Sequence, residues 1–257
     1  MKYLTIISLF DKSGIMLQPW ADAGHNCYAF DNDTYEGQYN NVNYVHFNLE
    51  CLLYSPLITI TELIDWMTGK FDGHKAPENI PDIIFSFTPC TDLSVSGARH
   101  FEAKRNKDPE FQLKAMQLFR TADRLAKICG DVPWITENPV SVAATMWRKS
   151  NEYYHPYEYG GYLPENDIHP KWPEYIPPRD AYPKKTGAWY GNGFIMPKKK
   201  PVKPVHSGND NFANCSQSFT KLGGKSAKTK EIRSLTPRGF AQAVFEANHQ
   251  PLIDKKR

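Results

Sequence analysis

A cysteine and a glutamate, each lying shortly after an apolar run, are the residues of this sequence best suited to chemistry. The run Ile83–Phe85 leads through Ser-Phe-Thr-Pro to Cys90, and a segment rich in serine and glycine follows. The run Val132–Ile135 leads through Thr136 to Glu137. If these runs are neighbouring parallel strands, a thiol and a carboxyl group meet at the carboxyl edge of one sheet. Such a pair can attack and protonate a flat heterocycle.

Length and composition indicate one α/β domain with embellishments. The chain has 257 residues, of which 40% are hydrophobic and 23% charged, as in an ordinary globular protein. No apolar run approaches the roughly 20 residues that cross a bilayer. Five scattered cysteines form no CxxC pair, and eight histidines show no metal-ligand spacing. We therefore expect no disulfide framework, no metal and no membrane partner, and a reducing bacterial or phage-infected cytoplasm as the location.

Positive charge is concentrated near the C-terminal end. Between Lys198 and Lys230 there are eight lysines and a single acid, Asp210, although the whole chain carries a net charge of only +3. A basic segment of this kind suits a polyanion, because each phosphate contact releases counterions. A solvated flexible tail explains the same composition equally well.

The order of apolar runs predicts a doubly wound α/β fold with a mostly parallel sheet. The expected strands are residues 2–10, 27–30, 42–47, 82–88 and 132–136, and the expected helices are 15–23, 61–67, 109–129 and 236–248. In such a fold, ligands bind beyond the carboxyl ends of the strands.

The character of the sequence changes after residue 150. Residues 153–190 contain ten tyrosines and tryptophans, and their prolines break any helix. We expect an irregular insertion rich in aromatic residues and proline, followed by a returning strand within 186–196. Three parts follow: a catalytic domain of residues 1–149 and 231–257, an insertion of 150–197, and a lysine-rich linker or loop of 198–230.

The cysteine segment carries a family resemblance. Pro89, Cys90, Ser94, Gly97 and Arg99 fit the pattern Pro-Cys-x-x-x-Ser-x-x-Gly-x-Arg. In spacing and order, this segment and Glu137-Asn-Pro resemble the DNA cytosine-5 methyltransferases, in particular compact phage relatives without a large target-recognition domain. The family resemblance implies a Rossmann-like methyltransferase fold, S-adenosylmethionine as cofactor, DNA as partner and a role in restriction-modification.

The N-terminal segment supplies the cofactor residues that the resemblance implies. Phe10-Asp-Lys-Ser-Gly14-Ile keeps the register of the family's Phe-x-Gly-x-Gly-Gly, with Lys12 and Ile15 in place of two glycines. An acid after the second strand accepts hydrogen bonds from a ribose diol in many nucleotide-binding folds. The implied cofactor residues are Phe10, Gly14, Asp31, Asp33, Asn48 and Pro89.

The resemblance also implies the chemistry. The Cys90 thiolate adds to C6 of a cytosine, C5 then takes the methyl group, and Glu137 holds N3 and the exocyclic amine. Arg99 contacts phosphate or closes the loop. The family's Gln-x-Arg-x-Arg strand is missing, so Lys185 is its candidate substitute. The implied DNA-binding residues are Ser94, Lys185, Lys198, Lys199 and Lys200.

Two other functions remain open at this point. The same fold and cysteine are suited to a free pyrimidine nucleotide, or to transfer of a group other than methyl. A non-catalytic DNA-binding or decoy protein is the second alternative, although such a protein has no need of Cys90 or Glu137.

Overall fold

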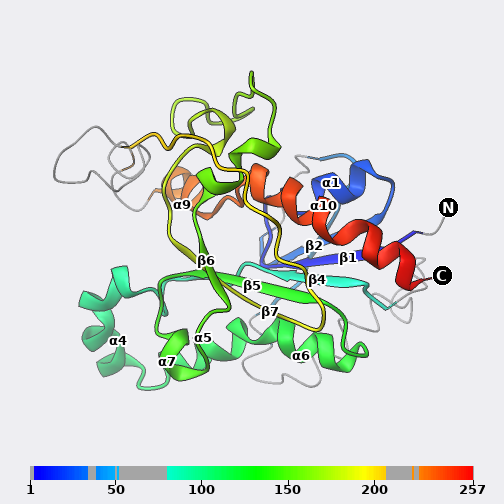
Figure 1. Cartoon of the computed structure of the whole chain (residues 1–257). Helices are drawn as coiled ribbons and strands as arrows, with labels where there is room; N and C mark the ends of the chain where they lie inside the picture. Colours follow the sequence, from blue (N-terminus) through cyan, green and yellow to red (C-terminus); the bar gives the residue numbers. More distant parts are fainter. Residues whose placement is uncertain are drawn as a thin grey trace.

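The chain forms a seven-stranded mixed sheet with helices on both faces (Figure 1). The computed structural model describes residues 3–33, 39–49, 51, 80–206, 222 and 226–256. The strand order is β3-β2-β1-β4-β5-β7-β6. The strands are β1 (Thr5–Leu9), β2 (Asn26–Asp31), β3 (Asn43–His46), β4 (Ile83–Ser86), β5 (Trp134–Pro139), β6 (Glu152–Tyr154) and β7 (Thr186–Gly191). All pairs from β3 to β5 are parallel, whereas β7 runs antiparallel to both β5 and β6.

The central strands are apolar because helices cover both of their faces. Every residue of β1 and β4 is buried, as expected for parallel strands inside a doubly wound sheet. Their register pairs Ile6 with Ile83 and Leu9 with Ser86. From β1 the chain proceeds outward to β2 and β3, and from β4 it proceeds outward on the other side to β5. The junction of β1 and β4 is therefore the topological switch point, where such folds bind ligands.

The helices form a layer on each side of the sheet. Figure 1 shows α1 and α10 on one side and α5, α6 and α7 on the other. The helices are α1 (Gln18–Asp22), α4 (Phe101–Lys107), α5 (Phe111–Phe119), α6 (Thr121–Ile128), α7 (Ala143–Met146), α9 (Ala227–Ser234) and α10 (Arg238–Lys255), with 3-10 turns η1 (Val95–His100), η2 (Pro156–Tyr162) and η3 (Pro178–Asp180). Two buried hydrophobic clusters, one on each face, hold the layers to the sheet.

The structure corrects parts of the sequence-based expectation. The single helix expected over 109–129 is wrong, because the chain breaks at Arg120 into α5 and α6. At this break the Arg120 guanidinium lies 4.9 Å from the ring centroid of Trp147. Three helices and one strand were not expected: α4, α7, α9 and β6. The expected helix at 61–67 lies outside the described residues.

The aromatic insertion of residues 150–197 is joined to the sheet and to α10. Its first and last parts are β6 and β7, which belong to the sheet. Between them, Asp167 and Asp180 flank Arg238 at the start of α10: the guanidinium donates to Asp167 Oδ1 at 2.8 Å and Oδ2 at 2.7 Å, and to Asp180 Oδ1 at 3.1 Å. Asp180 also accepts from the Gly239 backbone. The insertion is thus ion-paired to α10.

Replacing Arg238 by methionine is expected to destabilise the fold by about 3–5 kcal/mol, because two carboxylates that are 9% and 2% exposed lose their cation. Urea unfolding of the full chain measures this. The control is Arg105→Met on α4, an exposed arginine, which should change the unfolding free energy by no more than about 0.5 kcal/mol. Equal effects of the two substitutions would contradict the account.

Candidate active site

Cys90 lies just beyond β4, at the switch-point edge of the sheet. Cys90 is exposed, and its backbone carbonyl accepts hydrogen bonds from the amides of Leu93 at 3.1 Å and Ser94 at 2.8 Å. These bonds fold residues 90–94 into a tight turn. The thiol is therefore presented at the protein surface by a strand whose own residues are all buried.

The segment after Cys90 is tied to the segment after Glu137. The Val95 amide donates to the carbonyl of Val140 at 3.0 Å, and the Val142 amide donates to the carbonyl of Leu93 at 2.9 Å. An isolated antiparallel bridge between Ser94 and Ser141 completes this connection. The loop that carries the thiol and the strand that carries the carboxylate are therefore one hydrogen-bonded unit.

Glu137 lies on β5, next to β4, and is held by a buried tyrosine. The pairs Ser86–Thr136 and Phe85–Ile135 place β5 beside the strand that leads to Cys90. The Tyr154 hydroxyl, from β6, donates to Glu137 Oε2 at 3.1 Å. Tyr154 is 1% exposed and stacks on Phe240, with ring centroids 4.3 Å apart. The carboxylate is thus anchored from a strand that the sequence did not reveal.

The electrostatics of the thiol reflect this crowded edge. Partial removal from water raises the pKa of Cys90, Glu137 and Asp92 raise it further, and Lys184 acts in the opposite direction. Burial, followed by the charge of Glu137, raises the pKa of Tyr154 well above its usual range. Tyr154 therefore remains a proton donor to the carboxylate. Glu137 is therefore close enough to Cys90 for its charge to disfavour the thiolate.

Arg99 and Ser94 lie on the same loop but have different surroundings. Arg99 is exposed at the end of η1, where its Nε donates to His100 Nε2 at 3.1 Å. Ser94 is 5% exposed, and its hydroxyl lies 2.9 Å from that of Ser96. The arginine is accessible to a ligand, whereas the Ser94 side chain is covered.

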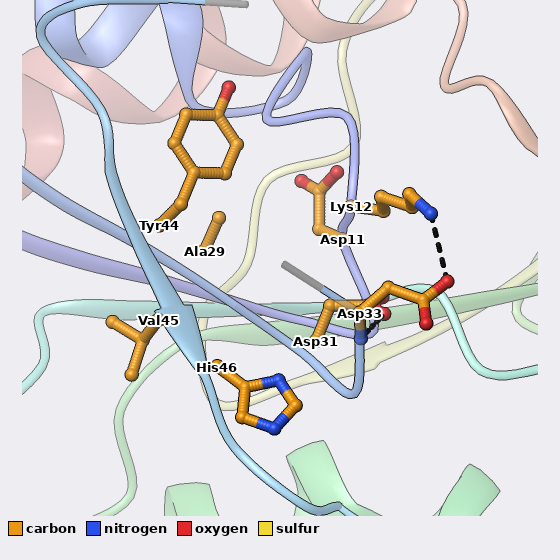
Figure 2. Close-up of a pocket in the computed structure, with 8 residues that line it drawn as sticks. All are labelled: Asp11, Lys12, Ala29, Asp31, Asp33, Tyr44, Val45 and His46. Carbon is orange, nitrogen blue, oxygen red and sulfur yellow. Dashed lines mark hydrogen bonds and ion pairs between the residues drawn. The ribbon is translucent and has the colours of Figure 1, made fainter. Parts of the chain in front are cut away.

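A hollow lies on the other side of the switch point, beyond the ends of β1 and β2. Figure 2 shows its lining: Asp11, Lys12, Ala29, Asp31, Asp33, Tyr44, Val45 and His46. Asp31 Oδ1 accepts from the Asp33 amide at 3.0 Å, and Lys12 Nζ pairs with Asp33 Oδ2 at 2.8 Å. Three carboxylates and one ammonium group thus surround the hollow.

Asp11 organises the turn that follows β1. One carboxylate oxygen accepts from the Ser13 hydroxyl at 2.9 Å and the Gly14 amide at 2.8 Å, and the other accepts from the Ser8 hydroxyl at 2.7 Å. Burial is the main reason that the pKa of Asp11 is raised, although these hydrogen bonds oppose the shift. Asp11 was not among the expected site residues. Its role could have been predicted from the Asp-x-Ser-Gly segment that follows the first strand, because this composition is typical of an Asx turn.

Gly14 is required by its conformation and by its neighbour. Its φ is +68°, in the left-handed region that glycine favours. The Tyr44 hydroxyl donates to the Ser13 carbonyl at 3.2 Å, and a Cβ on Gly14 would lie 2.5 Å from that hydroxyl. The ring of Tyr44 therefore covers the turn where the resemblance implies a glycine-rich cofactor loop.

The implied cofactor residues separate into two groups. Asp31 and Asp33 line the hollow, and Gly14 is in the turn behind it. Phe10 packs against the core on the α5–α6 side, Asn48 is exposed beyond β3, and Pro89 is exposed beside Cys90. The latter three lie outside the lining of the hollow. Lys12, Tyr44 and His46 line it without having been selected from the sequence.

The lysines selected for nucleic-acid binding are mostly engaged within the protein. Lys199 pairs with Glu158 at 2.9 Å, and Lys200 lies 3.6 Å from Glu246. Lys185 Nζ lies 4.7 Å from the centroid of the Tyr153 ring. Lys198 is exposed. Acids therefore offset part of the charge of this basic run.

The described residues contain no group of three or more histidine, cysteine, aspartate or glutamate side chains arranged to hold a metal ion. Among their helices, none is long and apolar enough to cross a membrane.

The fold belongs to a defined class. A sheet of order β3-β2-β1-β4-β5-β7-β6, with β7 reversed between β5 and β6, is the Rossmann-like methyltransferase fold. The expected fold class is thereby confirmed.

Comparisons with known proteins add little to this. No family model and no curated protein matches the sequence. One similar solved structure is that of an E. coli protein described as a DNA modification methyltransferase encoded within a prophage. The identity is 15% and the TM-score 0.43, and the match covers 78% of this chain and 53% of that one. The chain therefore spans about half the length of this neighbour.

Tyr154→Phe is expected to lower the free energy of unfolding by about 1.5 kcal/mol, because a buried donor to a carboxylate is lost while the stacking on Phe240 is kept. The matched control is Tyr190→Phe, which removes a 3.1 Å bond to Glu152 at an exposed position and should cost no more than about 0.5 kcal/mol. Urea unfolding measures both. A cost for Tyr190→Phe as large as that for Tyr154→Phe would show that burial of the bond has no role.

Gly14→Ala is expected to destabilise the protein more than Gly24→Ala. Both glycines have positive φ, but a Cβ at Gly24 meets nothing within 4 Å, whereas one at Gly14 meets Tyr44. Each variant bears the roughly 1 kcal/mol cost of the left-handed backbone, and only Gly14→Ala adds the steric term. Thermal unfolding measures the difference. Adding Tyr44→Ala to Gly14→Ala should remove the steric term, and a double variant without that recovery would contradict this assignment.

Proposed function

We propose that this protein transfers a methyl group from S-adenosylmethionine to C5 of cytosine in DNA. The observation that carries the proposal is the pairing of two strand ends. Cys90 follows β4, Glu137 lies on the adjacent parallel strand β5, and hydrogen bonds join the segments that follow each of them. A thiol and an anchored carboxylate at one sheet edge are what attack on a pyrimidine requires.

The reaction divides between the two side chains. Cys90 loses its proton to solvent, and the thiolate sulfur forms a bond to C6 of the cytosine. Glu137, held by Tyr154, would accept from the exocyclic amine with one oxygen and, when protonated, would pass its proton to N3, which neutralises the charge that the addition leaves on the ring. C5 would then take the methyl group of bound S-adenosylmethionine as the bond from that methyl to sulfur breaks and S-adenosylhomocysteine leaves. Loss of the C5 proton to a base and of Cys90 from C6 restores the aromatic ring and the free enzyme. The N3 proton returns to Glu137 when Cys90 departs.

The hollow beside the switch point suits the cofactor. S-adenosylmethionine, when bound, supplies an electrophilic methyl group and carries a sulfonium and an ammonium group. Three carboxylates against one lysine favour such a ligand electrostatically. Asp31, at the end of β2, is placed to accept from a ribose diol. The ion pair between Lys12 and Asp33 leaves Asp31 to make that contact.

The DNA partner is supported by exposed cations near the thiol loop. Arg99 is exposed on η1, and Arg105 and Lys107 are exposed on the helix that follows. Lys228 and Lys230 are exposed on α9. Arg99, Arg105, Lys107 and Lys230 are better placed for phosphate contacts than Lys199 and Lys200, which are ion-paired, and than Lys228, whose Nζ donates to the Tyr175 hydroxyl at 3.0 Å. Target recognition without a large separate domain would rest on the aromatic insertion and α9.

Cys90→Ala is expected to abolish formation of 5-methylcytosine, because no other group can form the bond to C6. Mass analysis of nucleosides from the DNA of cells expressing each form measures the product. The matched control is Cys51→Ala, which removes the other exposed cysteine of the described residues and should leave the product at the wild-type level. Product from the Cys90→Ala form would overturn the proposal.

The same proteins distinguish the alternative functions. Incubation of labelled cofactor with DNA or with dCMP separates a DNA enzyme from one that acts on free nucleotides. A covalent complex with 5-fluorocytosine DNA that requires Cys90 supports the proposed reaction. Tight DNA binding without such an adduct would indicate a non-catalytic binding protein.

A further inference from the structure

Lys184 lies at the same edge of the sheet as the thiol and the carboxylate. It comes two residues before β7, and the antiparallel register pairs Thr186, the first residue of β7, with Pro139, the last of β5. Glu137 is paired with Ala188 in the same register. Because side chains alternate along a strand, positions 186 and 188 lie on the face of the sheet that carries Glu137. Lys184 comes just before β7 and therefore lies beyond the end of β5, at the carboxyl edge of the sheet.

The ammonium group of Lys184 is held in place. Its Nζ donates to the backbone carbonyl of Arg233 at 3.0 Å, and its backbone amide donates to His155 Nδ1 at 3.1 Å. Arg233 lies in the last turn of α9, where helix carbonyls present partial negative charge. Arg233 in turn donates to the carbonyl of Leu222 at 2.8 Å. Lys184 is half-buried, so this cation is fixed near the site by α9.

The charges that act on Cys90 have opposing signs. Glu137 and Asp92 disfavour a thiolate, and Asp92 is ion-paired with Lys104. Lys184 is the cation with the largest opposing influence on the thiol. A thiol beside a catalytic carboxylate needs such a cation, because the thiolate is the reactive form.

The neighbouring lysine has a different position. Lys185 is exposed, and its Nζ lies over the ring of Tyr153. Lys185 is the expected substitute for the family's arginine, whereas Lys184 is the lysine whose charge favours the Cys90 thiolate.

We propose that Lys184 is the positioning residue that stabilises the thiolate of Cys90, and that α9 fixes it for this task. The step is a simple ionisation: the S–H bond breaks and the proton goes to solvent. The role of this thiolate in catalysis rests on the proposed function. The effect of Lys184 on the ionisation of Cys90 requires neither DNA nor cofactor.

Alkylation of Cys90 by iodoacetamide, followed on the full chain without DNA or cofactor, tests the proposal. Mass analysis of peptides isolates modification at Cys90 from that at Cys51, and the rate is measured from about pH 7 to about pH 11.5, because the pKa of Cys90 is raised. With Lys184→Gln, the midpoint of the curve of Cys90 alkylation rate against pH should rise by about half to one pH unit. Below that midpoint the alkylation rate should fall by about three- to tenfold. Lys184→Arg should restore the wild-type profile, and the matched control Lys185→Gln should not change it.

A second variant guards against misfolding of Lys184→Gln. Glu137→Gln removes the opposing charge, so its midpoint should fall, and the double variant Glu137→Gln/Lys184→Gln should return close to the wild-type midpoint. An unchanged profile for Lys184→Gln overturns the proposal. Weaker DNA binding by Lys184→Gln with an unchanged thiol profile also overturns it and marks Lys184 as a phosphate contact.

The two proposals fail separately. If Lys184→Gln shifts the alkylation profile but cells expressing the wild-type protein form no 5-methylcytosine, the role of Lys184 stands and the proposed reaction is excluded. If those cells form 5-methylcytosine and the alkylation profile of Lys184→Gln is unchanged, the reaction stands and the role of Lys184 is excluded.

Discussion

The parallel pairing of β4 with β5 is the constraint on which the candidate site depends. It places the end of one buried strand beside the end of another, so that a residue beyond the first and a residue on the second reach the same edge. Backbone hydrogen bonds from Val95 and Val142 then hold the two outgoing segments together. Because these bonds involve only the backbone, the edge is fixed by the path of the chain and does not depend on the side chains of Cys90 and Glu137.

The reversed strand β7 brings a third contribution to this edge. A parallel strand at that position would direct residue 184 to the opposite end of the sheet, far from the thiol. Reversal lets the chain enter β7 at the carboxyl edge of β5, beside Glu137. The aromatic insertion, fixed to α10 through Arg238 and its two aspartates, sets the direction of that entry. Parts of the chain more than forty residues apart are in this way combined around one thiol.

Much of the central sheet could be predicted from the sequence, and the reason is physical. β1 and β4 are continuous apolar runs, and such runs have few alternatives to a buried parallel strand. Cys90 and Glu137 were found because each follows such a run. Tyr154 and Lys184 were not found, because their contacts are with residues distant in sequence: Tyr154 with Glu137, Lys184 with Arg233. The break at Arg120 was missed for the same reason, since its stacking partner Trp147 lies beyond β5. Asp11 was missed although its partners Ser8, Ser13 and Gly14 are local. Within an aromatic stretch, nothing local distinguishes β6 from a loop.

The ring of Tyr44 belongs to β3, an edge strand that pairs with β2 in the described part of the chain. One wall of the hollow is therefore formed by an edge strand. Local opening of proteins begins at such margins, well before the interior yields. On warming, the wall formed by Tyr44 should therefore open at a lower temperature than the loop that carries Cys90. A ligand bound in the hollow should then be lost while that loop is still folded.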